Sequence, residues 1–126
     1  MLKVGILGAG GIASAMAKTI SQMTSARNFA VASRDLNKAR EFAAKWGVTK
    51  AYGSYEEMLA DPGVDLVYVA TPHSHHYPHV KLCLEHGKHV LCEKPFTVNA
   101  AQARELFRIA REKHLLLTEA MWARFL

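Results

Sequence analysis

A glycine-rich segment near the start of the chain has the residue types and the spacing that bind a pyrophosphate. Gly8, Gly10 and Ala13 stand at the small-residue positions of a G-x-G-x-x-A pattern, between an apolar run and a helical pattern. The first glycine permits a tight turn, the second lets the backbone approach a phosphate, and the third small residue lets a helix pack on a strand. A turn without a ligand is the alternative, but the strand–turn–helix context favours a dinucleotide site. The predicted contact residues are Gly8, Ala9, Gly10, Gly11 and Ile12.

The pair Ser33-Arg34, at the end of the second apolar run, indicates which dinucleotide the chain binds. Chains that bind NAD usually have Asp or Glu here, and its carboxylate holds the ribose hydroxyls. A hydroxyl and a guanidinium suit a 2′-phosphate, whereas a carboxylate would repel it. Asp35 comes slightly late and is better used as a helix N-cap. We therefore predict a preference for NADP(H) over NAD(H). The alternative for Arg34 is a solvent-exposed side chain without a ligand.

Four histidines, His73, His75, His76 and His79, lie within seven positions. Two of them, His76 and His79, have the spacing to share one helix face, which would suit zinc. No other type of ligand converges on them in the sequence, so we predict no metal site and leave the roles of His73, His75 and His79 open. Residues 71–75 follow a predicted strand, and ligands of open α/β sheets bind at the carboxyl ends of strands. This segment is therefore predicted to lie at the ligand-binding edge.

The segment Glu93-Lys94-Pro95 follows another predicted strand and so belongs to the same edge. A lysine here reaches the hydroxyl of a bound substrate or the nicotinamide ribose, and a neighbouring carboxylate orients it or tunes its basicity. Pro95 fixes the turn. The alternative is a surface Glu–Lys pair that contributes little. The spacing by itself leaves both interpretations open.

Short apolar runs and helical patterns, which must position these residues, alternate along the chain. Strands are predicted at residues 4–7, 29–32, 50–53, 66–70, 89–92 and 115–118, with helices between them. This alternation predicts an α/β fold, namely a Rossmann-type doubly wound parallel sheet with helices on both faces.

Helix ends and buried faces are predicted as well. N-caps are expected at Asp35, Ser54 and Asn99, helix ends at Gly47 and Gly87, and a turn at Asp61-Pro62-Gly63. Apolar faces are expected from Ile12, Met16, Ile20 and Met23 in the first helix, and from Ala103, Leu106, Phe107 and Ala110 in the last.

The composition suits a single domain and excludes several classes of function. The chain has 126 residues, half of them apolar, and a net charge of +5. Its basic residues are scattered, so we predict no nucleic-acid partner. No apolar run is long enough to cross a membrane, and glycines interrupt the one that imitates a signal peptide. Cys83 and Cys92 predict no disulfide framework, which favours a cytoplasmic location.

In this order and spacing, the motifs resemble the glucose–fructose oxidoreductase/inositol dehydrogenase family, known as Gfo/Idh/MocA. The segments that carry the resemblance are the glycine loop 8–13, Ala70-Thr71-Pro72 with His76, and Glu93-Lys94-Pro95. The final segment, 119–125, is most similar to the branch of dimeric dihydrodiol dehydrogenases and NADP-dependent xylose dehydrogenases.

The resemblance implies an NAD(P)-dependent oxidoreductase that acts on a sugar, a polyol or a related carbonyl compound. It makes Lys94 the catalytic lysine, bonded to the reacting hydroxyl and to the nicotinamide ribose, with Glu93 beside the nicotinamide. The other implied cofactor contacts are Thr71, Pro72 and His76 at the nicotinamide half, and Trp122 and Arg124 where the chain crosses between domains. The family often has Asn at the position of His73, so the role of this histidine stays open.

The resemblance covers the whole chain but only the N-terminal third of a typical family member. It implies that residues 1–126 form the NAD(P)-binding domain and that a C-terminal α+β domain, which carries a proton-transferring Tyr or His and the oligomer contact, is absent. We therefore expect the chain alone to be inactive and the full-length protein to be a homo-oligomer. A non-catalytic NAD(P)-sensing regulatory module is the alternative, but the intact Glu93-Lys94-Pro95 favours the enzyme.

Overall fold

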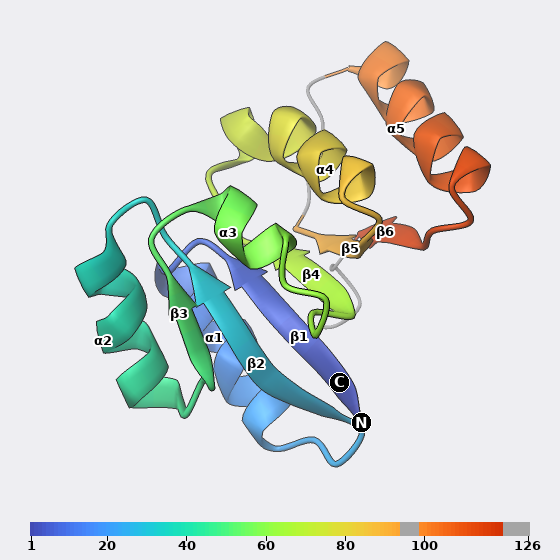
Figure 1. Ribbon diagram of the computed structural model, residues 1–126. Coiled ribbons are helices and arrows are strands. Elements are labelled where there is room, and N and C mark those ends of the chain that lie inside the picture. Colours follow the sequence, from blue (N-terminus) through green and yellow to red (C-terminus); the bar gives the residue numbers. More distant parts are fainter. Residues whose placement is uncertain (94–98, 120–126) are drawn as a thin grey trace.

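The computed structural model describes residues 1–93 and 99–119, which form a six-stranded parallel sheet covered by helices (Figure 1). The strand order is β3-β2-β1-β4-β5-β6, so the sheet grows in opposite directions from β1. The strands are β1 (Leu2–Leu7), β2 (Ala26–Ala32), β3 (Lys50–Tyr52), β4 (Leu66–Val69), β5 (His89–Cys92) and β6 (Leu117–Glu119). The predicted fold class is confirmed, and the predicted strand ends shift by up to three residues at β2.

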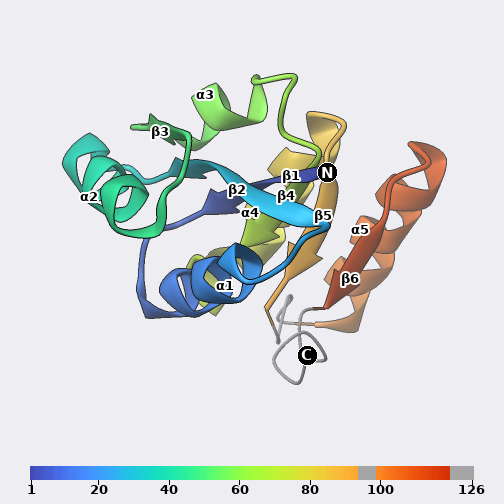
Figure 2. The same ribbon diagram turned by 90° about the horizontal axis from the view of Figure 1, so that it is seen from below.

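Helices cover both faces of the sheet, and α1 and α3 lie on opposite sides of it (Figure 2). The first face carries α1 (Gly11–Ser21) and α2 (Leu36–Trp46). The second carries α3 (Tyr55–Leu59), α4 (His76–Glu85) and α5 (Ala100–Glu112), and the short 3-10 helix His73–His75 leads into α4. Strands buried on both faces explain why the runs in β4 and β5 are almost continuously apolar.

Side chains predicted as caps begin the helices. Asp35 accepts hydrogen bonds from the backbone N–H groups of Asn37 and Lys38, at 2.9 and 3.4 Å. Ser54 accepts from the Glu57 N–H at 3.2 Å, the first bond of a capping box, and its hydroxyl donates to the Glu57 carboxylate at 3.0 Å. Asn99 accepts from the Gln102 N–H at 2.8 Å, and Gly47 ends α2 with a φ of +66°. These predictions are confirmed.

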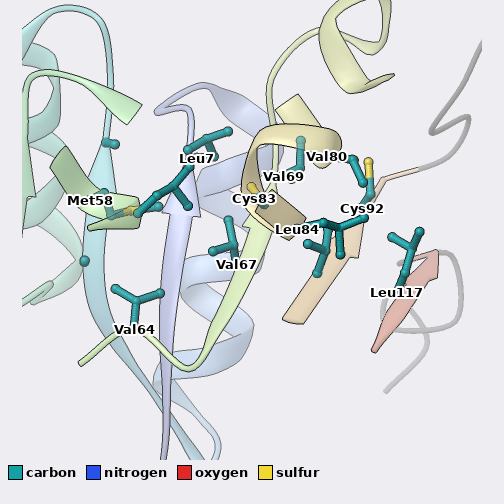
Figure 3. Close-up of a cluster of buried hydrophobic side chains, with 14 of the residues drawn as sticks. Leu7, Met58, Val64, Val67, Val69, Val80, Cys83, Leu84, Cys92 and Leu117 are labelled. Carbon is teal, nitrogen blue, oxygen red and sulfur yellow. The ribbon is translucent and has the colours of Figure 1, made fainter. Parts of the chain in front are cut away.

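Two hydrophobic cores, one on each face, hold the layers together. On the second face, side chains of β1, β4 and β5 meet side chains of α3 and α4 (Figure 3). On the first face, Tyr68 and Leu91 pack with the α1 side chains Ala13, Ala17 and Ile20. Val67 and Val69 belong to one core and Tyr68 to the other, as the alternation of side chains along a strand requires.

The predicted inward faces of α1 and α5 are partly wrong. Ile12 is 48% exposed, because the small residues Ala13 and Ala17 are the ones that face the sheet, and Met23, 45% exposed, lies beyond the end of α1. In α5, Phe107 is 43% exposed while Leu106 is fully buried. Helical periodicity identifies apolar neighbours, but the packing of small residues decides which of them turns inward.

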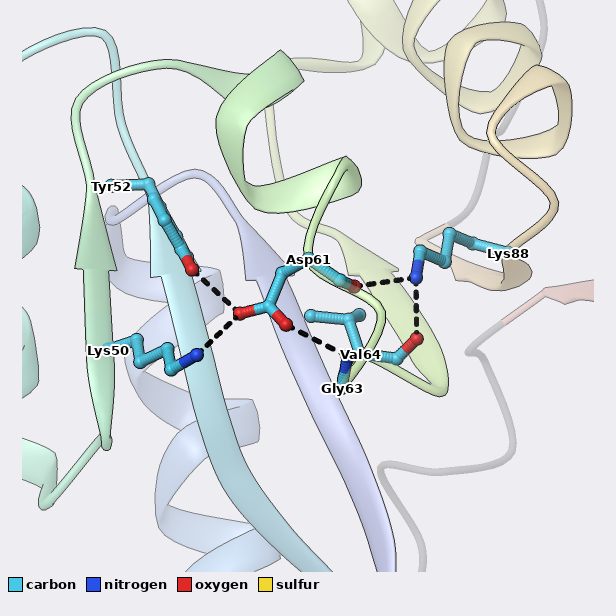
Figure 4. A network of polar contacts seen from close by, with 6 residues as sticks. All are labelled: Lys50, Tyr52, Asp61, Gly63, Val64 and Lys88. Atoms are coloured by element: carbon cyan, nitrogen blue, oxygen red, sulfur yellow. Dashed lines mark hydrogen bonds and ion pairs between the residues drawn. The ribbon is translucent and has the colours of Figure 1, made fainter.

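A polar network at the predicted turn 61–63 ties three segments together (Figure 4). The Asp61 carboxylate accepts hydrogen bonds from Lys50 Nζ at 3.0 Å, Tyr52 Oη at 2.6 Å and the Gly63 N–H at 2.8 Å. The buried Lys88 ammonium donates to the carbonyls of Asp61 and Val64, at 2.8 and 2.9 Å. The network therefore connects β3, the turn before β4 and the segment before β5.

Asp61→Asn is expected to lower the free energy of unfolding at pH 7 by about 1–3 kcal/mol. Burial on its own raises the pKa of Asp61, but the hydrogen bonds from Tyr52, Gly63 and Lys50 outweigh it and lower the pKa from 3.8 to about 2. The charged form therefore stabilises the fold above about pH 4, and this contribution is lost as the pH falls toward 2.

Urea unfolding at pH 7 and at pH 3 checks this expectation. The difference between the wild type and Asp61→Asn should shrink to roughly half at pH 3. Glu112→Gln is the control, because Glu112 forms an exposed ion pair with Arg108 at 3.3 Å, which contributes little. An equal effect of Asp61→Asn at both pH values would contradict the assignment.

Candidate functional site

A cleft with a volume of about 520 Å³ lies at the carboxyl edge of the sheet, where the strand order reverses between β1 and β4. Among the described residues, the segments that follow β1, β2, β3, β4 and β5 all contribute to it. In open α/β sheets this position is the ligand-binding crevice. The lining residues are Gly8, Ala9, Gly10, Gly11, Ile12, Ser33, Lys38, Tyr55, Ala70, Thr71, Pro72, His76 and Glu93.

The loop after β1 contains three glycines, and the reason that each position needs a small residue is not the same. Gly8 has a φ of +105°, and a Cβ there would lie 3.3 Å from the backbone of Ala70, so the fold itself requires glycine. At Gly10 and Gly11, by contrast, a Cβ would meet no described atom within 4 Å. Packing within the described chain therefore does not explain these two glycines, whereas a group bound in the cleft would.

The start of α1 suits an anion. Gly10 is its N-cap with an extended backbone, and among the described residues no side chain caps it. The first turn contains no acidic residue, so no carboxylate competes for its N–H groups. Free N–H groups and the positive end of the helix dipole attract phosphate.

The β2–α2 connection contributes polar and basic groups. The Ser33 hydroxyl accepts a hydrogen bond from the Asp35 N–H at 3.2 Å, which fixes it at the edge of the cleft. Arg34 is exposed beside it. Lys38, in the first turn of α2, also lines the cleft, and sequence reasoning missed it. Its place one helical turn after Arg34 is the signal that would have identified it.

The connection after β4 is held by two histidines. Thr71 is 6% exposed; His76 Nε2 lies 2.6 Å from its carbonyl, and His79 Nδ1 lies 2.7 Å from its hydroxyl. His76 is 2% exposed, so its ring is a wall of the cleft rather than a surface group. The structure thus brings the predicted Thr71, Pro72 and His76 together.

Across residues 1–93 and 99–119, no three His, Cys, Asp or Glu side chains are grouped closely enough to hold a metal ion. His75 and His79 approach each other with ring centroids 5.6 Å apart, and the His79 ring contacts Tyr55 edge-on at 4.9 Å. These contacts make His79 part of the packing between α3 and α4.

Glu93 ends the described part of the β5 connection. Its side chain is 3% exposed and lines the cleft together with His76 and the glycine loop. The predicted residues Lys94, Trp122 and Arg124 lie outside the described residues. Tyr55, at the start of α3, was not predicted, because only the tertiary fold brings it to this edge.

A parallel sheet whose order reverses beside a glycine loop, with a cleft at that point, defines a dinucleotide-binding domain of the Rossmann class. Residues 2–121 match the Gfo/Idh/MocA family, described as an oxidoreductase family with an NAD-binding Rossmann fold. The chain belongs to this family, which confirms the resemblance found in the sequence.

Relatives with known activities support this membership. Over 126 residues the chain is 51% identical to the trans-1,2-dihydrobenzene-1,2-diol dehydrogenase of Mus musculus, covering 98% of this chain and 38% of that protein. Over 136 residues it is 48% identical to the D-xylose 1-dehydrogenase (NADP(+)) of Hypocrea jecorina, covering 98% and 35%.

A solved structure agrees with the fold. The 3-ketoreductase KijD10 from Actinomadura kijaniata, in complex with NADP, superposes with a TM-score of 0.90 at 35% identity, over 94% of this chain and 38% of that one. The chain therefore spans little more than a third of the length of these relatives.

In the part of the chain that the structure describes, no helix has the length and apolar character to cross a membrane.

Proposed function

We propose that this chain is the NADP(H)-binding domain of an oxidoreductase that transfers a hydride between the nicotinamide and a sugar, a polyol or a related carbonyl compound. The observation that carries the proposal is the cleft at the reversal of strand order, where Gly10 and Gly11 leave space that no described side chain fills. A pyrophosphate fits this space, since the uncapped start of α1 faces no competing carboxylate.

The cleft supports one orientation of the dinucleotide. Ser33 and Lys38 line the cleft and the exposed Arg34 follows Ser33, so the segment offers a hydroxyl and two cations, which match a 2′-phosphate better than a ribose diol. Thr71, Pro72, His76 and Glu93 line the other end and would hold the nicotinamide half. We extend the same proposal to Lys94, Trp122 and Arg124, which lie outside the described residues.

The chemistry divides between the cofactor and the chain. When bound, the nicotinamide gives or accepts the hydride. We assign Lys94 to hydrogen-bond the reacting oxygen of the substrate, where its ammonium stabilises the charge that develops during transfer. The Glu93 carboxylate, one residue earlier and buried in the cleft, orients that lysine.

The names of the relatives support the substrate class. A dihydrodiol, D-xylose and a 3-keto group all present a hydroxyl or carbonyl on a small polar molecule. Because the relatives are more than twice as long as this chain, we further propose that the whole protein has a second domain, which covers the substrate and makes the contacts of a homo-oligomer. Cys83 and Cys92 are both buried and form no disulfide, which suits the cytoplasm that we propose as the location.

NADPH is expected to bind about tenfold or more tightly than NADH, because an arginine–phosphate contact contributes roughly 1.5–3 kcal/mol. Isothermal titration calorimetry with both nucleotides measures the ratio. Arg34→Ala should lower the ratio by about tenfold by weakening NADPH alone, whereas Arg108→Ala, on α5 and outside the cleft, should leave it unchanged. Equal affinities in the wild type would contradict the preference for NADP(H).

A further inference from the structure

His79 stands directly behind the wall of the cleft and joins two parts of it. Its Nδ1 atom lies 2.7 Å from the hydroxyl of Thr71, which follows β4. The other side of its ring contacts Tyr55 of α3 edge-on, at 4.9 Å and an angle of 73°. Thr71 and Tyr55 both line the cleft, whereas His79 does not.

The wall that His79 joins runs from Thr71, which borders the proposed nicotinamide half and the glycine loop, to Tyr55 beside the proposed ADP half. At one end, a Cβ placed on Gly8 would lie 3.3 Å from Thr71 Cγ2, so Thr71 packs against the glycine loop. At the other end, Tyr55 lines the cleft together with Ser33 and Lys38, which face the 2′-phosphate position. A shift of His79 would therefore move the wall between the two phosphate sites.

The ring of His79 is held as a neutral hydrogen-bonding group. Burial lowers the pKa of His79 to about 4, and the neighbouring His75, Arg34 and His76 act in the same direction. The groups around it are Tyr55 from α3, Arg34 from the β2–α2 connection, and His75 and His76 from its own segment. A neutral imidazole makes a directional hydrogen bond to the Thr71 hydroxyl at neutral pH without adding charge.

We propose that His79 is a positioning residue for the nucleotide, which holds the Thr71 hydroxyl and the Tyr55 ring in the wall that runs along the nucleotide from the glycine loop to the 2′-phosphate end. This inference rests on the proposed function, because it requires a nucleotide in the cleft. His79 contacts no part of the nucleotide in this scheme. It acts through Thr71 and Tyr55, so affinity should depend on which of its two contacts a substitution preserves.

Two substitutions separate those contacts. Asparagine places an amide near the position of Nδ1, so His79→Asn keeps the hydrogen bond to Thr71 and loses the ring against Tyr55. Phenylalanine does the reverse in His79→Phe. Affinities for NADPH and for adenosine 2′,5′-bisphosphate, which carries the adenosine, the 2′-phosphate and one 5′-phosphate but no nicotinamide half, are measured by calorimetry. His79→Phe should weaken both by about five- to tenfold, and His79→Asn by no more than about threefold.

The outcomes are distinguishable. Thermal unfolding by circular dichroism confirms that each variant is folded at the titration temperature, and His86→Ala, at the far end of α4, is the matched control without an effect on affinity. If the wild type binds neither ligand, the proposed function itself fails. If the wild type binds both and His79→Phe binds them equally well, the positioning role is overturned. A loss in His79→Asn as large as in His79→Phe also overturns the role of the Thr71 hydrogen bond.

Discussion

Gly10→Val is expected to weaken NADPH binding by at least about a hundredfold while lowering the free energy of unfolding by only about 1 kcal/mol. The backbone of Gly10 has a φ of −90°, which any residue adopts, and a Cβ there meets no described atom within 4 Å. The valine side chain therefore changes the free energy of unfolding of the nucleotide-free protein little. It does, however, occupy the space in which we place the pyrophosphate, and a phosphate cannot approach the start of α1 past two methyl groups.

Gly8→Ala is the matched control in the same loop. The φ of Gly8 is +105°, and a Cβ there lies 3.3 Å from the Ala70 carbonyl, so this variant should lose roughly 1–3 kcal/mol of stability. Urea unfolding and calorimetric titration of both variants give the comparison. Gly10→Val should lose NADPH affinity with little loss of stability. In Gly8→Ala the main effect should be the loss of stability. NADPH affinity in Gly10→Val equal to the wild type would remove the pyrophosphate from this loop.

The alternation of elements was predictable from the sequence, because each strand of a doubly covered sheet is a short apolar run and each helix carries its own signals. The capping side chains Asp35, Ser54 and Asn99 act within three residues of their own position. The turn at Asp61 also depends on a contact between near neighbours in the sequence, since the Asp61 carboxylate accepts from the Gly63 N–H. Contacts between residues two or three positions apart can be predicted from the spacing of residue types in the sequence.

Contacts between distant segments were not predictable in the same way. Lys88 reaches the carbonyls of Asp61 and Val64, more than twenty residues away, and only the neighbouring positions of β4 and β5 explain it. Tyr55 and His79 meet because α3 and α4 cover the same face of the sheet. The exposure of Phe107 likewise depends on which side of α5 packs against the rest of the protein. A single sequence shows which residue types are present, but it does not show which distant residues contact one another in the fold.

Lys94→Ala is expected to lower kcat by about a hundredfold or more in a version of the protein extended to the length of its relatives. Glu93 is buried and lines the cleft, and Lys94 is the next residue in the sequence and its first cation after β5, which is why we propose it as the partner of the reacting oxygen. NADPH affinity should change by less than about threefold, because the proposed phosphate contacts lie at the glycine loop and at Ser33 and Arg34.

Steady-state kinetics with D-xylose and a dihydrodiol, beside titration of NADPH, test this split between turnover and binding. The control is Lys113→Ala, which changes an exposed lysine at the end of α5 and should keep full activity.

The 126-residue chain by itself should bind NADPH without turnover, because neither a second proton-transfer group nor a cover over the nicotinamide belongs to the proposed site. A Lys94→Ala enzyme that retained most of its kcat would reduce Lys94 to a surface lysine. Turnover by the short chain would mean that the whole catalytic apparatus lies within these residues, and the role proposed for the second domain would then be wrong.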